Sequence, residues 1–302
     1  MKKVLITGAN SYIGMSFEQY ATEHYSEWLQ VNTVDMIDGS WRKKNFSPYD
    51  IVFHVAGMAH ADIGNVTDDV KAKYYAITTD LAIETARKAK SDGVKQFVFM
   101  SSVIIYGDSA PYGKIKRITR DTEPQPANFY GDSKWRADQG VRKLADENYT
   151  VCVLRSPMIY GKGCKGNYPI LAKIAKKSPV FPNIENERSM LYIENLCEFL
   201  CQVMIRGEGG IFWPQNAEYS KTSDMVQCIA DALGHRIWVS KAFNWAIQLA
   251  SRIPGKIGCL ANKAFGNQTY DPGMSKCDFE YQIVDLKTSI ERTEGSWQKK
   301  IN

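Results

Sequence analysis

Hydrophobic positions in the first half of the chain fall into short continuous runs separated by longer segments of helical period. Runs rich in β-branched and aromatic residues predict strands at 3–7, 31–35, 51–56, 96–101 and 150–155. Apolar residues at helical spacing predict helices over 75–89 and 133–148. Runs such as IVFHVAG and FVFMSS are apolar nearly throughout, as strands covered on both faces are. The pattern predicts an α/β fold with a doubly wound parallel sheet.

The pattern changes after Tyr160, where Gly, Pro and Lys interrupt it in GKGCKGNYP and SPVFPNIENERS. This second part predicts a smaller, loop-rich portion that interleaves with the sheet. Residues 238–256 mix Trp, Phe, Ile and Leu with basic residues. We favour a helix that packs within the second portion, with a helix lying on a membrane surface as the alternative.

Composition adds a few constraints. The chain has 302 residues, 44% hydrophobic and 24% charged, which is enough to bury a large core. Its net charge of +5 is spread along the chain, so no nucleic-acid partner is expected. Its 7 cysteines form no C-x-x-C pair, which favours reduced thiols in a cytoplasm. Because the chain shows no secretory signal and no apolar run of ~20 residues, we expect a cytoplasmic protein without a membrane span.

The stretch TGANSYIG follows the first predicted strand and leads into a segment of helical period. Gly8 and Gly14 bracket a turn in which backbone N–H groups and a helix N-terminus can approach a pyrophosphate. Ser11 replaces a middle glycine, and we expect the loop to tolerate its small side chain. Asp35 closes the second predicted strand, where an acid accepts hydrogen bonds from a ribose diol; an ordinary turn residue is the alternative. The carboxylate favours NAD, while basic residues at 42–44 keep NADP as the alternative.

The stretch YGDSK gives the strongest chemical signal. Tyr130 and Lys134 are four positions apart, so they share one face of a helix. The lysine charge favours the phenolate, and we expect it to draw the pKa of Tyr130 toward neutrality, so that the phenol exchanges a proton with a sugar hydroxyl or a ketone. Ser102 ends the fourth predicted strand and offers a third hydrogen-bonding group. An exposed helix start is the alternative, because Y-x-x-x-K alone arises often by chance.

In this order the motifs resemble the extended short-chain dehydrogenase/reductase family, specifically its NAD-dependent nucleotide-sugar epimerases, reductases and dehydratases. The resemblance covers nearly the whole chain through TGANSYIG, HVAGMAH, SSVIIYG, YGDSK and LRSPMIYG, with Ser11 as a departure from TGxxGxxG. It implies a Rossmann-type NAD-binding domain over 1–160 with a return segment at about 188–215. It also implies a smaller, loop-rich nucleotide-sugar-binding domain over 161–187 and 216–302.

The same resemblance implies roles for single residues. Tyr130, Lys134 and Ser102 are the expected catalytic set, and LRSPMIYG brings 156–158 beside the nicotinamide. Substrate contacts are expected from Ser102, Met158, Asn167 and Arg188; the guanidinium suits a diphosphate, with a surface salt bridge as its alternative. Cofactor contacts are expected from Gly8, Asn10, Ser11, Tyr12, Ile13, Gly14, Asp35, Asn45, Phe46, Ala56, Gly57, Tyr130, Lys134 and Pro157.

Two departures from the family pattern change the expectation. The segment WRKKNF replaces the acid that contacts adenine, so Asn45 and Phe46 are the expected adenine neighbours. Family dehydratases carry Asp-Glu directly after the catalytic Ser or Thr, whereas Val103 and Ile104 follow Ser102 here, so dehydration is not expected. His54 and His60 have no third ligand at suitable spacing. We therefore expect no metal, and His54 is expected to pack at a strand end.

The expected reaction is reversible oxidation at C4 of a nucleotide-linked hexose. We expect a 4-epimerase that acts on a UDP-hexose or UDP-N-acetylhexosamine in bacterial surface-polysaccharide synthesis. The alternative is an NAD(P)H-dependent reductase of a UDP-4-keto-6-deoxy-N-acetylhexosamine, because GKGCKGNYP and PNIENERSMLYI resemble a subgroup that includes both activities. In that subgroup the aglycone can be a polyprenyl diphosphate, so peripheral contact with a lipid-linked sugar stays open. A non-catalytic dinucleotide-sensing module is less favoured, and the resemblance implies a homodimer.

Overall fold

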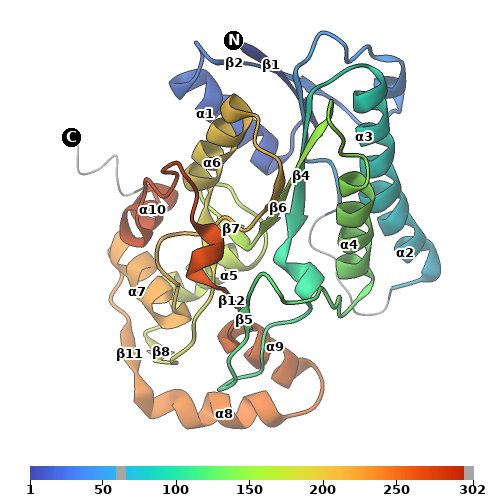
Figure 1. The fold of residues 1–302 in the computed structure, drawn as a ribbon. Coiled ribbons are helices and arrows are strands. Elements are labelled where there is room, and N and C mark those ends of the chain that lie inside the picture. The colour runs from blue at the N-terminus through green and yellow to red at the C-terminus, as the bar shows by residue number, and fades with distance from the viewer. Residues whose placement is uncertain (59–65, 296–302) are drawn as a thin grey trace.

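The computed structural model describes residues 1–58 and 66–295. Its centre is a parallel six-stranded sheet in the order β10-β6-β4-β3-β1-β2 (Figure 1). The strands are β1 (Lys2–Thr7), β2 (Leu29–Val34), β3 (Ile51–His54), β4 (Gln96–Ser102), β6 (Thr150–Ser156) and β10 (Gly210–Phe212). The first five overlap the predicted runs, with ends that differ by one or two residues. The doubly wound parallel sheet is confirmed.

Helices cover both faces of this sheet (Figure 1). The helices α1 (Tyr12–His24) and α6 (Ile193–Arg206) lie on one face, and α3 (Leu81–Ser91) and α4 (Phe129–Arg142) lie on the other. Along β1, Val4 and Ile6 belong to the core under α1 and α6, whereas Leu5 belongs to the core under α3 and α4. Because alternate side chains are buried on opposite faces, the strand is apolar at consecutive positions.

The predicted helix over 75–89 is the second part of a longer helical run. It begins with α2 (Asp68–Tyr74), passes through a π-helical turn (Tyr75–Asp80) and continues as α3. The prediction missed the first part because several charged residues there weaken the apolar periodicity.

The predicted helix over 133–148 is displaced toward the N-terminus. It starts at Phe129 because the side chain of Asn128 accepts a hydrogen bond from the Gly131 amide at 3.1 Å. It ends at Arg142. In the connection to β6, the Asp146 carboxylate accepts a hydrogen bond from the Asn148 amide, which forms a turn.

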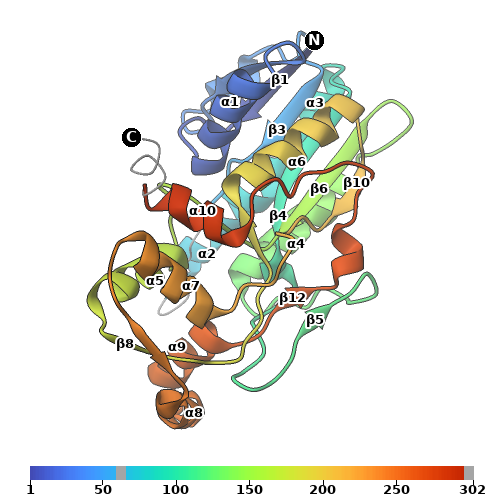
Figure 2. The same cartoon turned by 90° about the vertical axis from the view of Figure 1, so that its left-hand side faces the viewer.

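The smaller portion gathers at the carboxyl ends of the sheet strands (Figure 2). Three two-stranded pairings tie distant segments together, namely β7 with β9, β8 with β11, and β5 with β12. Its elements are β5 (Arg117–Ile118), β7 (Met158–Tyr160), α5 (Asn167–Lys177), β8 (Val180–Pro182), β9 (Met190–Tyr192), α7 (Thr222–Ala232), β11 (Trp238–Ser240), α8 (Asn244–Arg252), α9 (Lys256–Phe265), β12 (Thr269–Tyr270) and α10 (Leu286–Thr293). The domain boundaries stay a prediction.

The segment 238–256 differs from the expected packing helix. It forms β11, a short turn and α8, and no residue of α8 is buried. The side chains of Trp245 and Leu249 are 68% and 58% exposed. No helix within 1–58 and 66–295 is long and apolar enough to cross a bilayer.

Candidate active site

The loop after β1 closely approaches the loop after β3. Gly8 has a φ of +115°, and a Cβ added there would lie 2.9 Å from the backbone nitrogen of Ala56, so only glycine fits. Asn10 also has a positive φ, 63°, which asparagine tolerates better than most residues. These loops leave β1 and β3 where the strand order reverses, which is where parallel α/β sheets bind ligands.

Ser11, which stands where the family pattern has its middle glycine, is the N-cap of α1. Its side chain caps α1 by accepting a hydrogen bond from the Gly14 amide at 3.1 Å. The amides of Tyr12 and Ile13, in the first turn, have no acceptor within the helix and face the end where the dipole is positive. Close backbone approach at the loop and free amides at the helix start fit a dinucleotide pyrophosphate.

His54 ends β3 and is 1% exposed. Its Nδ1 lies 2.7 Å from the hydroxyl of Thr7, and its ring stacks with Phe97 and Phe99. Burial, with a smaller effect of the Lys134 charge, lowers its pKa to about 3. The expected packing of His54 at a strand end is confirmed. His60 lies outside the described residues, and within them no three His, Cys, Asp or Glu form a group that could hold a metal.

Asp35 adjoins the phosphate loop. The amides of Gly8 and Ala9 both donate to the carbonyl oxygen of Val34, at 3.0 and 3.3 Å, directly before Asp35. The carboxylate is exposed and accepts from the amide of Ile37 at 2.8 Å. This position suits a ribose diol, and the role of Asp35 stays a prediction.

The adenine neighbours need a correction. Phe46 is 0% exposed, and its ring packs in the core with Trp41 while Lys88 Nζ lies 4.9 Å from the ring centroid. A side chain without accessible surface offers nothing to a ligand, so the expected contact of Phe46 with adenine is wrong. Asn45 is exposed, and its side-chain oxygen accepts a hydrogen bond from the Ser47 backbone amide at 2.9 Å. The NH₂ group of the Asn45 side chain is thus the part that can donate to adenine, and this role stays a prediction.

The start of α4 brings Tyr130 to the carboxyl end of β4. A Cβ added to Gly131 would lie 2.9 Å from the carbonyl oxygen of Ile104, so the helix start packs tightly on the short turn Val103–Tyr106. That turn follows Ser102, whose hydroxyl accepts from the Ile104 amide at 3.3 Å. The helix start that carries Tyr130 therefore lies against the turn that follows Ser102.

Lys134 lies between the ends of β3 and β4. Its ammonium donates to the carbonyl oxygen of Met100 at 2.9 Å and lies 5.3 Å from the centroid of the Phe99 ring. A Cβ added to Gly57 would be 3.6 Å from the same nitrogen. The ammonium is thus beside the segment Ala56–Gly57 that was expected to contact the cofactor.

The electrostatics differ from the expectation. Burial, and to a smaller extent the neighbouring Tyr74, raises the pKa of Tyr130 to about 12. Burial lowers the pKa of Lys134 to about 8. The expected shift of the phenol toward neutrality is wrong for the protein without ligands, because desolvation dominates and the ammonium bonds to the Met100 carbonyl.

Ser156 is the partner of Ser102 in the register between β6 and β4. It is 2% exposed, and its hydroxyl has no hydrogen-bond partner among the described residues. A buried hydroxyl without a partner is costly, so a polar ligand atom is expected to satisfy it. Pro157 follows, buried between β6 and β7, where the resemblance implies that the nicotinamide passes.

An ion pair that the sequence did not reveal supports these strand ends. Asp138 is fully buried, four positions after Lys134 on α4, and accepts from Ser101 at 3.0 Å and from Arg155 at 3.0 and 3.1 Å. Arg155 also donates to the hydroxyl of Tyr106 at 2.7 Å. An arginine inside the apolar run VCVLRS was the available signal, since a buried charge needs a partner. The pair joins α4, β4 and β6 behind the expected catalytic residues.

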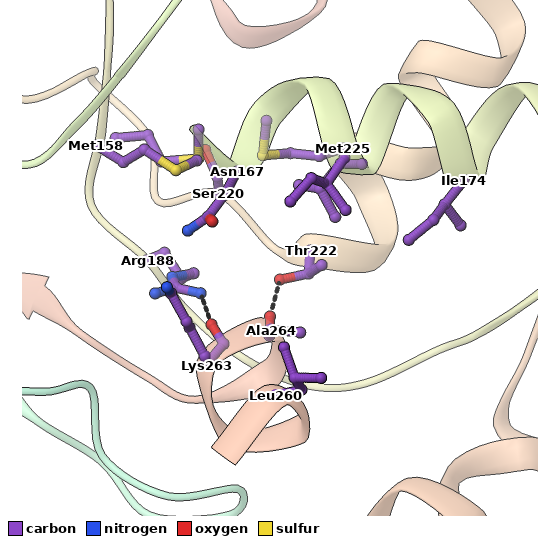
Figure 3. A pocket seen from close by; sticks show the side chains of 13 residues that line it. Met158, Asn167, Ile174, Arg188, Ser220, Thr222, Met225, Leu260, Lys263 and Ala264 are labelled. Atoms are coloured by element: carbon purple, nitrogen blue, oxygen red, sulfur yellow. Dashed lines mark hydrogen bonds between the residues drawn. The ribbon is translucent and has the colours of Figure 1, made fainter. Parts of the chain in front are cut away.

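Met158, Asn167 and Arg188 come together around one pocket (Figure 3). Arg188 donates to the carbonyl oxygen of Lys263 at 2.6 Å and to the hydroxyl of Ser109 at 3.0 Å. Burial lowers the pKa of its guanidinium. The structure brings three of the four predicted substrate residues together, whereas Ser102 does not line this pocket, and all four roles stay predictions.

The rest of the pocket is mostly apolar, and sequence analysis missed it. Figure 3 shows Ile174 and Met225 at the end away from Arg188. The hydroxyl of Ser220 is buried without a partner among the described residues. The further lining residues are Ile170, Leu171, Met190, Thr222, Leu260, Lys263 and Ala264. The lining residues come from α5, β9, α7 and α9 and from connecting segments, so no single stretch of sequence predicts the pocket.

Two curated relatives match about two thirds of the chain. A UDP-glucose 4-epimerase of Vibrio cholerae is 29% identical over 216 residues, which cover 68% of this chain and 64% of the relative. An N-acetyl-α-D-glucosaminyl-diphospho-ditrans,octacis-undecaprenol 4-epimerase of Escherichia coli O157:H7 is 25% identical over 216 residues, covering 65% and 61%. The chain is therefore matched to less than two thirds of the length of either relative.

Solved structures show the same fold. WbmG of Bordetella bronchiseptica, solved with NAD and UDP, superposes with a TM-score of 0.71 at 18% identity, over 98% of this chain and 94% of that one. A family model described as the NAD dependent epimerase/dehydratase family matches residues 4–212, which include the phosphate loop, Ser102, Tyr130, Lys134 and Arg188. The chain belongs to this NAD-dependent family of enzymes, as its motifs predicted.

Proposed function

We propose that the protein is an NAD-dependent 4-epimerase of a hexose or N-acetylhexosamine held through a diphosphate, UDP-linked in the first instance. The main support is that Lys134 donates to the Met100 carbonyl on β4, while the start of the same helix, at Tyr130, packs on the turn that follows Ser102. The pocket with Arg188 begins at Met158, two residues beyond the unpartnered hydroxyl of Ser156. In this proposal the sugar lies at Tyr130 and its diphosphate lies at Arg188.

Each residue has a role in this proposal. Tyr130 takes the proton of the C4 hydroxyl as that carbon is oxidised, and it returns a proton when the 4-keto sugar is reduced. Bound NAD would supply a hydride acceptor for C4 that gives the same hydride back, and the positive charge of its ring would offset the burial that raises the pKa of the phenol. Ser102 donates a hydrogen bond to the reacting oxygen. Lys134 holds the cofactor ribose from its position beside Gly57.

Epimerisation requires the sugar to turn over between the two half-reactions. Arg188 holds the diphosphate during this step, because its guanidinium suits two phosphate oxygens. Dehydration lacks its acid-base pair, since the apolar Val103 and Ile104 follow Ser102 in the turn against α4. A non-catalytic sensing module is less well supported, because it would have no use for both Tyr130 and Lys134.

The same residues suit the alternative, an NAD(P)H-dependent 4-keto reductase. The observation that favours it is the likeness of GKGCKGNYP and PNIENERSMLYI to a subgroup with both activities. Asp35 favours the epimerase, because a carboxylate repels the 2′-phosphate of NADPH and an epimerase regenerates its NAD in every cycle. Cytoplasmic synthesis of a bacterial surface polysaccharide by a homodimer belongs to the same proposal.

The test is an assay of products without added reductant. The protein is incubated with NAD and either UDP-glucose or UDP-N-acetylglucosamine, and we expect the C4 epimer of at least one of them. If no epimer forms in either direction while NAD(P)H is consumed on a UDP-4-keto-6-deoxy-N-acetylhexosamine, the reductase is the correct assignment.

A further inference from the structure

Helices α8 and α9 and the strand β11 before them present large apolar side chains that are exposed in the described part of the chain. We define the α8–α9 surface by six residues that are 41% to 68% exposed, namely Trp238, Trp245, Leu249, Ile253, Ile257 and Leu260. In Figures 1 and 2, α8 forms the outermost edge of the smaller portion, at the end of the molecule opposite the N-terminus. Large exposed apolar patches of this kind mark interaction sites.

The stretch of sequence that forms this surface carries basic residues and no acidic ones. Residues 232–270 contain no Asp or Glu, in a chain with 33 acidic residues. The basic residues of this stretch are Arg236, Lys241, Arg252, Lys256 and Lys263. Lys241 is approached by Glu185 from another segment, at 3.6 Å, whereas Arg252 and Lys263 form no salt bridge with any described residue. The surface is therefore suited to an anionic partner.

The α8–α9 surface is continuous with the candidate substrate pocket. Leu260 belongs to both, and Lys263 and Ala264, on the same helix, line the pocket. The carbonyl oxygen of Lys263 holds the guanidinium of Arg188. An apolar wall thus runs from the expected diphosphate position to the outside of α9 (Figure 3).

Tryptophan, aliphatic and basic side chains on one exposed helical surface are typical of proteins that lie on anionic membranes. A second copy of the chain fits less well. A two-fold contact would bring this surface against itself, so that its cations would face the same cations with no acid in the stretch to pair them. The charge therefore distinguishes a membrane from self-association.

We propose that the α8–α9 surface docks on an anionic lipid bilayer and that the pocket takes a sugar whose diphosphate is carried by a membrane lipid. The lipid chain would leave the pocket along the apolar wall formed by Leu260 and Ala264. The proposal of membrane docking depends only on the exposed apolar and basic residues of the α8–α9 surface. The choice of a lipid-linked sugar rests on the proposed function, because it assumes C4 chemistry at Tyr130.

The first test is co-sedimentation with vesicles. We expect the protein to bind vesicles of phosphatidylglycerol and phosphatidylcholine, to bind phosphatidylcholine alone about tenfold more weakly, and to be released by salt. The variant Trp245→Ser/Leu249→Ser should lose the binding. The control Trp28→Ser/Ile283→Ser removes side chains that are 58% and 47% exposed elsewhere and should keep it.

Three outcomes would overturn the docking proposal: no vesicle binding by the wild type, an equal loss in the control variant, or wild-type self-association that the Trp245→Ser/Leu249→Ser variant abolishes in sedimentation velocity. Circular dichroism and thermal unfolding of the variants ensure that a folded protein is compared. Neither mutated residue lines the pocket, so the variant should turn over a soluble UDP-sugar like the wild type.

The second test separates docking from the proposed function. Polyprenyl-diphosphate N-acetylglucosamine in anionic vesicles should be turned over about tenfold more slowly by the Trp245→Ser/Leu249→Ser variant, with turnover of UDP-N-acetylglucosamine unchanged. Equal turnover of the vesicle-borne sugar by both proteins would overturn the lipid-linked substrate. If the wild type turns over neither sugar, the proposed function fails, while the vesicle binding still decides the docking.

Discussion

The ammonium of Lys134 donates to the carbonyl oxygen of Met100 at 2.9 Å, and this bond fixes a cation at the end of β4. Tyr130 is one helical turn earlier on α4, where the helix start packs on the turn that follows Ser102. Without a ligand the phenol has a raised pKa, so the protein alone does not hold a phenolate. The cofactor and the substrate are needed to complete the electrostatics of the site.

Replacing Tyr130 with Phe should abolish turnover while cofactor binding stays intact. The change removes the proton carrier but keeps the ring that packs edge-to-face with Tyr74, 6.1 Å between centroids. We expect the rate to fall at least ~100-fold, as loss of a general acid-base does. Tyr74→Phe is the matched control and should keep most of the activity. A Tyr130→Phe rate within about tenfold of wild type would refute the role.

Replacing Lys134 with Met should weaken cofactor binding and slow turnover together. The ammonium is expected to hold the ribose, and a hydrogen bond from a charged group contributes about 1.5–3 kcal/mol. Isothermal titration with NAD and steady-state kinetics measure the two effects. Lys143→Met, an exposed lysine just after the same helix, serves as the control. Unchanged NAD affinity in Lys134→Met would contradict the ribose contact.

Replacing Ser11 tests whether its hydroxyl is a helix cap or a phosphate ligand. Since the hydroxyl accepts from the Gly14 amide, Ser11→Gly should change NAD affinity by no more than ~1 kcal/mol. Ser11→Ala should lower the free energy of unfolding by ~1 kcal/mol and Ser11→Gly by a few tenths, as N-cap replacements do. A much larger loss of NAD affinity in both variants would make Ser11 a direct phosphate ligand.

His54 should make the free energy of unfolding depend on pH. Its pKa is lowered from 6.5 to about 3, so below pH 6.5 the unfolded chain binds a proton that the folded protein does not. His54 therefore costs about 2 kcal/mol of stability between pH 7 and pH 5. Urea unfolding at the two pH values measures this, and His54→Asn should remove it while His24→Asn, at an exposed site, should not. An equal pH dependence in wild type and His54→Asn would contradict the shift.

Local sequence was enough to predict five of the six sheet strands and the position of the phosphate loop, but it did not reveal β10. Strands such as β1 bury both faces and therefore appear as continuous apolar runs, and TGANSYIG joins one of them to a helix. The burial of Phe46 was beyond local reasoning. Its ring packs in a core cluster with Trp41, and its backbone amide donates a hydrogen bond to the carboxylate of the distant Asp92. The apolar residues of α8 were visible in the sequence, but nothing local showed that Trp245 and Leu249 are exposed in the described part of the chain.

The candidate site was predicted unevenly for similar reasons. The spacing of Tyr130 and Lys134 placed both on one helical face, but the carbonyl of Met100, on a different element, decides where the ammonium points. Met158, Asn167 and Arg188 lie on separate elements, so only the family resemblance, and not local sequence, predicted that they contribute to one site. The buried pair Asp138 and Arg155 was missed because the two residues are brought together only by the packing of α4 on β6.

The fate of hydrogen at C4 tests the central claim most directly. The protein is incubated with NAD and each UDP-sugar in deuterated water, without added reductant, and C4 is followed by NMR. The account predicts interconversion of the C4 epimers with no deuterium at C4, because that hydrogen stays on the bound cofactor while Tyr130 exchanges only the hydroxyl proton. Deuterium at C4, or no epimer in either direction, would contradict it.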